Sequence, residues 1–463
     1  MVTLSDPPRE SFRLSQLIYD TRYRSMTIQV VALIGFLILL GWLFSNTMQN
    51  LTELGKEPSF RFLSDPAGYD INQRLIDYNN QDTHLRAAFI GLLNTLLVAF
   101  LGCITATVLG VIIGVLRLSK NWLVARLMTI YVEMFRNVPV LLWIVFVMAI
   151  LIESLPAPRA FKGENPSATM KVFDTVAVTN RGIYVPEVQF GRDAKDDKGE
   201  YLDEPTGWRT GLGDFPVGAD PDNPSCESYF ASEGPMAGEP GPGCGRFQIS
   251  LDLMAIILVL MAGFYVSHRI KTRADHIQEA TGERPTTWYL RLGVIVIPLA
   301  ILFWAMGTYL TYPSIERGFN FQGGTHMRNS LIALWLALSL YTAAFIAEIV
   351  RAGIMAISHG QTEAAAALGL RPKRIMSLVI LPQALRVIIP PLISNYLNLT
   401  KNSSLAIAVG YMDITGTLMG ITLNQTGREL ETVLLGMLIY LTISLSISAV
   451  MNWYNNSVKL VER

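Results

Sequence analysis

Charged side chains that interrupt long apolar runs are the residues of this sequence whose types could do chemistry. Glu133 and Arg136 stand one helical turn apart in one apolar run, and Glu348 stands near the end of another. A charged group at the middle of a bilayer costs about 2.5–3.5 kcal/mol, and it persists mainly where it faces a partner or a wet cavity. The spacing predicts that Glu133 and Arg136 pair on one helix face. A salt bridge near the membrane surface and a contact with a substrate both fit this group.

A second polar group follows the adjacent prolines Pro390 and Pro391 in a later apolar run. Each proline lacks the N–H group that a helix uses, so the pair interrupts the hydrogen-bond ladder. Asn395 and Asn398 are three residues apart and therefore share a helix face. Such a face could contact a carboxylate and an ammonium group, or it could hold two subunits together. The predicted pathway residues are Asn395, Asn398, Lys401, Ser403 and Ser404, together with Glu348 and Arg136.

Between these two runs lies a polar stretch that has helix-start and helix-stop residues at its two ends. Ser358 followed by Gln361 is a capping-box pattern, and Glu363 favours the positive end of a helix dipole. Gly369 supplies a left-handed stop, and Pro372 can begin a second helix. The stretch therefore predicts a helix, a sharp turn and another helix across the membrane surface. Its alanines could let another protein approach closely, although an ordinary capped helix has the same pattern.

The sequence lacks the motifs of common catalytic and nucleotide-binding sites. No phosphate loop of the form G-x-x-x-x-G-K-S/T occurs, so the chain is not expected to hydrolyse ATP by that route. The HExxH, Cys-x-x-Cys and nucleophile-elbow patterns are missing as well. Its 5 histidines are scattered and predict no metal cluster. We therefore predict no catalytic residues and no metal ligands.

Composition places the chain among membrane proteins. Hydrophobic residues make up 51% and charged residues 16%, and the apolar residues come in long blocks. A helix needs about 20 apolar residues to cross about 30 Å of hydrocarbon, so the fold class is all-α and polytopic. The formal net charge of zero gives no basic face for nucleic acid. Eight spans are predicted, at residues 26–47, 87–116, 123–152, 250–267, 289–311, 328–350, 383–405 and 430–454. Pro139 is predicted to bend or break the third span.

Basic residues in the short loops orient these spans, because Lys and Arg stay on the cytoplasmic side. The arginines before the first span and Lys459 and Arg463 after the last one fall on the same side. Both termini are therefore predicted to be cytoplasmic, and segments 48–86 and 153–249 to be external. The first apolar run follows several arginines and lacks a small-residue cleavage site, which indicates a retained span and not a cleaved signal.

The long segment 153–249 mixes loop chemistry with a hairpin pattern. β-prone residues flank the turn at 179–182, which predicts a β-hairpin. We expect a small lid with limited regular structure, and a disordered excursion is the alternative. Cys226 and Cys244 either form a disulfide, if the compartment is oxidising, or remain free thiols. An acidic cluster in this segment consists of Asp193, Asp196, Asp197, Glu200, Asp203 and Glu204.

The polar stretch at 358–374 resembles the EAA loop of ABC importer permeases. The residues that carry the likeness are Glu363, Ala364, Ala365, Gly369, Val379, Leu381 and Pro382, with Val379 where the family usually has Ile. In that family the loop forms the coupling helices that seat in a groove of the ATPase subunit. The coupling residues that the resemblance implies are Ser358, Gly360, Gln361, Glu363, Ala364, Ala365, Gly369, Arg371, Leu381 and Pro382.

Further stretches are similar to permeases of the polar amino-acid uptake branch. They are residues 94–96, 131–139, 348–353, 381–391 and 401–405. That branch normally has a five-span core, and three extra spans with a long external segment resemble the larger permease subunit of importers for glutamate, glutamine, aspartate and asparagine or for general L-amino acids. The expected units are an N-terminus with an extra span and an external loop (1–86), two core spans (87–152), the external insertion (153–249), two extra spans (250–311) and three core spans with the coupling loop (328–463).

The resemblance implies a type I importer permease in a bacterial inner membrane. Its partners would be a shorter second permease, an ATPase dimer and a periplasmic binding protein, and its substrate a polar L-amino acid. ATP and Mg²⁺ would bind the ATPase, and this chain would bind no cofactor. Two other classes stay open. An ion-coupled secondary transporter predicts inverted repeats and an acidic midplane site, and a membrane sensor would use 153–249 as its receptor.

Overall fold

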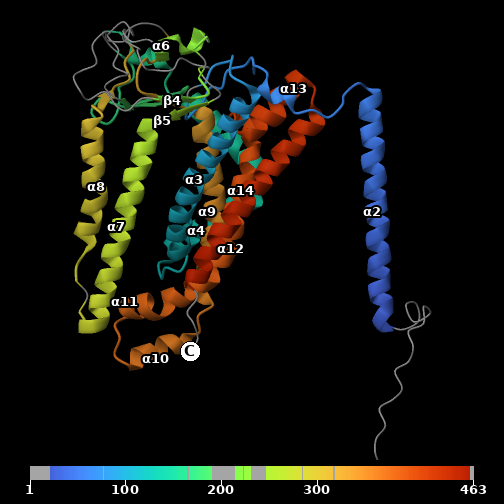
Figure 1. Cartoon of the computed structure of the whole chain (residues 1–463). Helices are drawn as coiled ribbons and strands as arrows, with labels where there is room; N and C mark the ends of the chain where they lie inside the picture. Colours follow the sequence, from blue (N-terminus) through green and yellow to red (C-terminus); the bar gives the residue numbers. More distant parts are fainter. Residues whose placement is uncertain are drawn as a thin grey trace, which may run out of the picture.

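The computed structural model describes residues 21–76, 78–163, 166–189, 214–219, 221–222, 224–230, 244, 247–283, 285–315 and 319–458. Long helices run side by side between two unlike ends (Figure 1). One end carries short strands and is called the strand end. The other carries the helices α10 (His359–Ala367) and α11 (Pro372–Ile375) and is called the loop end. The predicted acidic cluster at 193–204 and the C-terminal Lys459 and Arg463 lie outside the described residues.

Eight helical segments among the described residues are long and apolar enough to cross a membrane, which confirms the prediction of eight spans. They are Arg24–Glu53 in α2 (Thr21–Glu53), His84–Leu116 (α3), Val140–Phe161 beginning with α5 (Val140–Ser154), Leu251–Thr281 (α7), Trp288–Ala305 (α8), Asn329–Met355 (α9), Pro372–Val409 around α12 (Leu381–Asn402), and Glu429–Trp453 in α14 (Glu429–Val458).

The predicted third span at 123–152 is two helices. α4 (Trp122–Asn137) ends before Val138, which is extended, and Pro139 stands directly before α5. A proline disfavours helical backbone in the residue before it and lacks an N–H of its own. The predicted break at Pro139 is confirmed, but only the second helix qualifies as a span. The prediction of one span that begins at 123 is therefore wrong.

The prolines of the seventh span have a smaller effect than that of Pro139. Pro390 and Pro391 lie inside α12, which stays helical from Leu381 to Asn402. A π-helical turn, Met376–Ile380, joins α11 to α12, and a 3-10 helix, Ser403–Val409, continues the chain toward the strand end. The lost N–H groups remove individual hydrogen bonds without ending the helix.

Helices α3 and α9 form the centre of the bundle, and α9 also packs against α4, α5 and α12. Glycines let the two backbones approach closely. A Cβ atom at Gly110 would lie 2.6 Å from the Cβ of Ile346, and one at Gly114 would lie 2.7 Å from the carbonyl oxygen of Ala347. The close contact between α3 and α9 therefore depends on these two glycines.

Three spans stand away from this centre (Figure 1). α2 exposes its apolar side chains along its length, and α7 and α8 form an antiparallel pair. Gly263 of α7 brings the pair together, because a Cβ there would lie 3.3 Å from the backbone of Ile295. These three helices correspond to the three extra spans that the sequence predicts beyond a five-span core.

Short strands from residues 153–249 form small antiparallel sheets with strands that adjoin α7, α8 and α9. β1 (Ala177–Thr179), β2 (Gly182–Val185) and β7 (Thr325–Arg328) form one antiparallel sheet in that order. The β1–β2 pair confirms the predicted hairpin, and β7 leads directly into α9. The other pairs are β3 (Glu187–Gln189) with β6 (Tyr309–Thr311), and β4 (Asp214–Val217) with β5 (Phe247–Ser250).

Short helical turns complete the described chain. They are the 3-10 helices Arg61–Ser64, Pro158–Phe161 and Pro224–Cys226, the π-helix Thr415–Thr422, and the α-helices α6 (Glu227–Phe230) and α13 (Leu423–Thr426). Near α6 the structure joins Cys226 to Cys244 by a disulfide, with 4.8 Å between their Cα atoms. The described part of 153–249 thus contains regular structure and a cross-link.

Candidate functional site

The predicted coupling residues form a short helix, a tight turn and a second helix that project beyond the long helices at the loop end (Figure 1). Ser358 has the extended backbone of an N-cap, but its side chain makes no capping hydrogen bond. The predicted capping box between Ser358 and Gln361 is therefore wrong. Glu363 instead contacts its own helix, where its Oε1 lies 2.9 Å from Nδ1 of His359, one turn earlier. The helix start and end that the sequence predicts are nevertheless observed.

The turn between α10 and α11 depends on one glycine. Gly369 has a φ of 79°, in the left-handed region that favours glycine, and its N–H donates to the carbonyl of Ala366 at 2.9 Å. Arg371 has the extended backbone of an N-cap, and Pro372 is the first residue of α11. Open space surrounds the position that a Cβ of Gly369 would take. The glycine is therefore needed for its conformation and not for close packing.

The free surface of α10 combines polar side chains with small residues, and an exposed leucine follows the helix. Leu368 is 83% exposed, while Ala365 is buried together with Ile375 of α11. Gly360, Gln361, Glu363 and Ala364 are exposed. The two remaining predicted coupling residues, Leu381 and Pro382, lie at the start of α12, in the stem of the loop and not on α10.

Above the loop, Glu348 of α9 gathers three arginines into a group that we call the loop-end cluster: Glu348, Arg117, Arg136 and Arg351. Arg117, at the end of α3, donates from Nη1 to Oε2 of Glu348. Arg351 donates from Nη2 to Oε1 at 2.9 Å. Arg136 of α4 places its Nη1 3.8 Å from Oε2. The two predicted pathway residues Glu348 and Arg136 are thus in one cluster.

Arg136 does not pair with Glu133 as predicted. Its guanidinium lies over the ring of Phe345, 5.5 Å from the ring centroid, and beside Glu348. Glu133 is exposed and accepts a hydrogen bond from Nδ2 of Asn137 at 3.4 Å. The spacing within α4 predicted the wrong partner for Arg136, because Phe345 and Glu348 of α9 provide an aromatic ring and a carboxylate beside its guanidinium.

The remaining predicted pathway residues divide into two classes along α12 and the turn after it. Three side chains bond to their own backbone: Nδ2 of Asn395 donates to Pro391 at 2.9 Å, Ser403 donates to Thr400 at 2.8 Å, and Ser404 donates to Lys401 at 2.8 Å. Asn398 and Lys401 are exposed. The second class is more exposed than the first, in which Ser403 is buried and Asn395 and Ser404 are half-buried.

The depth of Lys401 makes its exposure informative. Leu399 packs against Gly102, since a Cβ at Gly102 would lie 3.0 Å from Cδ2 of Leu399. Gly102 lies near the middle of α3, so Asn398 and Lys401 lie near mid-depth of the spans. Among the described residues Lys401 makes no ion pair. A free ammonium group at this depth is costly unless a second subunit or a wet pathway covers it.

Sequence reasoning missed the junction that ties α3 to the segment before α14. Asn94, buried in α3, donates from Nδ2 to the carbonyl of Met412 at 2.8 Å. Asp413 is fully buried, and its Oδ2 accepts from the hydroxyl of Tyr440 at 2.9 Å. A lone aspartate between two apolar runs was the available signal. These two hydrogen bonds hold the backbone at Met412 and Asp413 against α3 and α14.

Comparison with known proteins gives a consistent family. The matching family model is described as "Binding-protein-dependent transport system inner membrane component", and it matches residues 249–460. The chain is 55% identical over 471 residues to the "Glutamate/glutamine/aspartate/asparagine transport system permease protein BztB" of Rhodobacter capsulatus, and the match covers 100% of both chains.

Two further relatives match along nearly their whole lengths. One is the "Putative amino-acid ABC transporter permease protein YhdX" of Escherichia coli, 40% identical over 443 residues and covering 95% of each chain. The other is the "General L-amino acid transport system permease protein AapQ" of Rhizobium johnstonii, 37% identical over 455 residues and covering 98% of this chain and 96% of that one. The chain therefore belongs to the family of amino-acid ABC transporter permeases, multi-pass membrane proteins of binding-protein-dependent transport systems.

Proposed function

We propose that this chain is the larger of two permease subunits in an importer of polar L-amino acids, and that residues 358–374 transmit work to it from a separate ATPase. The substrate class rests on the relatives, because the full-length match at 55% identity carries glutamate, glutamine, aspartate and asparagine in its name. ATP and Mg²⁺ would be bound by the ATPase dimer. A periplasmic binding protein would deliver the amino acid.

The single observation that carries this proposal is the projecting α10–α11 loop. Its free surface exposes Leu368 to 83% beside small alanines, and such an apolar tip fits a groove in a partner. The stems are α9 and α12, which pack on each other in the bundle. A displacement of the loop would therefore be transmitted to the helix bundle through α9 and α12 and not through a flexible linker.

Charge supports a cytoplasmic loop end and an external strand end. Arg117 and Lys120 follow α3 at the loop end, and Arg371, Lys373 and Arg374 lie in the loop itself. Positive residues in short loops favour the cytoplasmic side. α2 begins at the level of the loop end in Figure 1, so the N-terminal end of α2 is assigned to the cytoplasm as well.

A second permease subunit would cover the exposed face of α12. Ser394, Asn398 and Lys401 share that face at spacings of four and three residues, and all three are exposed. Lipid would be a poor partner for a lysine near mid-depth. We infer that Asn398 and Lys401 face the second permease or the pathway between the two subunits.

The test is assembly with the ATPase and second permease encoded by neighbouring genes. Glu363→Arg and Leu368→Glu should lower recovery of the ATPase with the tagged permease by about tenfold, because a loss of about 1.4 kcal/mol in binding is a factor of ten. Glu279→Arg is a matched control, because Glu279 is an exposed carboxylate 3.6 Å from a histidine on α7. Wild-type recovery in both loop variants would refute the coupling role.

A further inference from the structure

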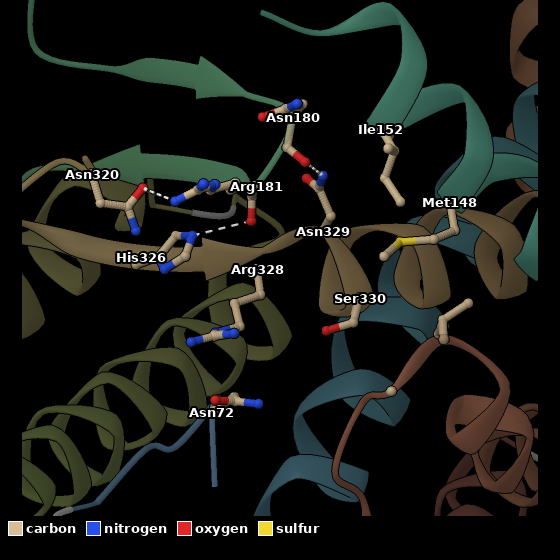
Figure 2. A pocket seen from close by; sticks show the side chains of 12 residues that line it. Asn72, Met148, Ile152, Asn180, Arg181, Asn320, His326, Arg328, Asn329 and Ser330 are labelled. Atoms are coloured by element: carbon tan, nitrogen blue, oxygen red, sulfur yellow. Dashed lines mark hydrogen bonds between the residues drawn. The ribbon is translucent and has the colours of Figure 1, made fainter. Parts of the chain in front are cut away.

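A polar cavity of about 450 Å³ opens at the strand end, beside the start of α9 (Figure 2). Its wall combines the β1–β2 turn of the insertion, β7, the first turn of α9, the outer part of α5 and the segment around Gly410. This volume is in the usual range for small-molecule sites. We call it the strand-end pocket and define it by six of its polar lining residues, Asn180, Arg181, Asn320, His326, Arg328 and Asn329; Asn72 and Ser330 also line it.

Three polar atoms of this lining are buried without a hydrogen-bond partner among the described residues. They are Nε of Arg328 and the side-chain oxygens Oδ1 of Asn180 and Asn329. Asn329 is fixed in place, because its Nδ2 donates to the backbone carbonyl of Asn180 at 2.5 Å. Buried polar groups are normally satisfied, and each one that is not needs an explanation. Because these atoms are buried, the lining side chains would turn toward the cavity for a bound molecule with one acceptor group and one donor group to supply the missing partners.

The electrostatics of the pocket favour an anionic group near Arg328. Arg181 and Arg328 both line it, and no carboxylate is among its described lining residues. α9 begins there with Arg328 at its N-cap and no side-chain cap, so the positive end of the helix dipole faces the same space. Burial lowers the pKa of His326 and the charge of Arg328 lowers it further, while the hydrogen bond to the carbonyl of Arg181 acts in the opposite direction.

The donors and acceptors are held apart by the fold. His326 stacks on Tyr184 with 4.1 Å between ring centroids, and its Nε2 donates to the carbonyl of Arg181 at 3.2 Å. Nη1 of Arg181 in turn reaches Oδ1 of Asn320 at 3.5 Å. Figure 2 shows Asn180 and Asn329 near each other and Arg328 below the strand, so oxygens and guanidinium line different parts of one cavity.

We propose that the strand-end pocket is a receiving site for the zwitterionic head of a free α-amino acid. The carboxylate would lie at Arg328 and the N-terminus of α9, and the ammonium group would donate to the side-chain oxygens of Asn180 and Asn329. The inference rests on the proposed import function and adds to it a site that the insertion helps to build. Arg181 and Asn320 leave a polar region for the polar side chain of the substrate.

The experiment is equilibrium binding of radiolabelled L-glutamate to the assembled transporter in nanodiscs, without the binding protein. Two analogues of L-glutamate test recognition of its two charged α-groups separately: 4-aminobutyrate lacks the α-carboxylate, and glutarate lacks the α-amino group. Wild type should prefer L-glutamate over each by about tenfold or more, the effect of losing one charge-assisted contact. Arg328→Met should lose the preference over 4-aminobutyrate and keep that over glutarate, whereas Asn180→Ala should do the opposite.

The controls separate this site from the general function. Arg159→Met changes an exposed arginine at the strand end that does not line the pocket, and it should leave all affinities unchanged. Arg328→Lys keeps the charge but not the planar fork, so it should weaken L-glutamate binding several-fold and serves if Arg328→Met does not assemble. ATP-driven uptake by wild type tests the proposed function independently. Two results would overturn the site. One is ATP-driven uptake by a wild-type transporter that does not bind L-glutamate in this assay, and the other is unchanged affinity for all three ligands in assembled Arg328→Met and Asn180→Ala.

Discussion

The two ends of the α9 helix hold arginines in opposite circumstances. At the loop end, Glu348 gathers three guanidinium groups, and the side chain of Arg117 is only 8% exposed. At the strand end, Arg328 makes no side-chain hydrogen bond within the described residues, and its Nε is buried. Nε of Arg117 and of Arg351 is also without a partner, but each of these residues reaches Glu348 through another nitrogen.

This difference indicates that the loop-end arginines stabilise the fold, whereas Arg328 is placed to bind a ligand. A charge network that is closed within the chain fixes three helices relative to one another, and its removal should appear first in stability. A charged group without an internal partner is costly to the fold, and it persists where a ligand or another subunit supplies the partner. Variants at the two ends should therefore move stability and transport in different directions.

The largest effect is expected at the loop-end cluster. Glu348→Ala leaves three arginines without their shared carboxylate, and breaking such a network costs about 3–5 kcal/mol when it is fully buried. Because the Glu348 side chain is 28% exposed, we expect about 3 kcal/mol, the lower end of that range, in thermal unfolding of the detergent-purified chain. Glu133→Ala, at an exposed carboxylate, should change stability by less than about 0.5 kcal/mol. Equal melting temperatures for both variants would contradict a structural role for the cluster.

Lys401→Met tests the middle of the pathway. Replacing an exposed ammonium group near mid-depth by an apolar side chain should not lower thermal stability, because it removes a costly charge. ATP-driven uptake in proteoliposomes should nevertheless fall by about tenfold, the effect of losing about 1.4 kcal/mol of interaction. Full uptake with unchanged assembly would exclude Lys401 from the pathway and from the subunit interface.

Arg328→Met should not lower the unfolding free energy, in contrast to Glu348→Ala. Since the guanidinium has no hydrogen-bond partner among the described residues, removing it should leave the unfolding free energy unchanged or raise it by about 1 kcal/mol. Thermal unfolding without substrate measures this directly. Destabilisation as large as that of Glu348→Ala would show that Arg328 is part of the fold and would remove the contrast between the two ends.

The smallest effect is expected at Ser403. Its hydroxyl already donates to the carbonyl of Thr400 at 2.8 Å and is buried, so it is not free to meet a substrate. Ser403→Ala should therefore leave uptake within about twofold of wild type, a change of about 0.4 kcal/mol. A tenfold loss of uptake would return Ser403 to the pathway residues.

The loop end could be predicted from the sequence because its determinants are local. Gly369 and Pro372 fix a turn and a helix start through their own backbone preferences, and the structure has both. The eight spans are equally local, since length and hydropathy define them. Pro139 broke the third span for the same kind of reason.

What could not be predicted depends on partners far away in sequence. Arg136 joins Glu348 across more than two hundred residues, and spacing within α4 suggested Glu133 instead. The strand-end pocket is a stronger case, because β2 of the insertion pairs with β7, and β7 leads into α9. Nothing in the sequence placed Asn180 beside Asn329. Ser358 is an exception, because its predicted capping box with Gln361 is local in sequence and no side-chain capping bond forms.

The most direct test of the central claim is a cross-link between the loop and the ATPase. Leu368→Cys, on a Cys103→Ser background, places a thiol on the exposed tip of α10, and Glu279→Cys places one on α7 as the control. In the assembled transporter, a short bifunctional maleimide should join residue 368 to cysteines introduced on the surface of the ATPase that faces the membrane, with a yield that changes on ATP binding, and should leave residue 279 unjoined. Coupled uptake without any cross-link at residue 368, or equal cross-linking at both positions, would contradict the claim that this loop transmits the work of ATP.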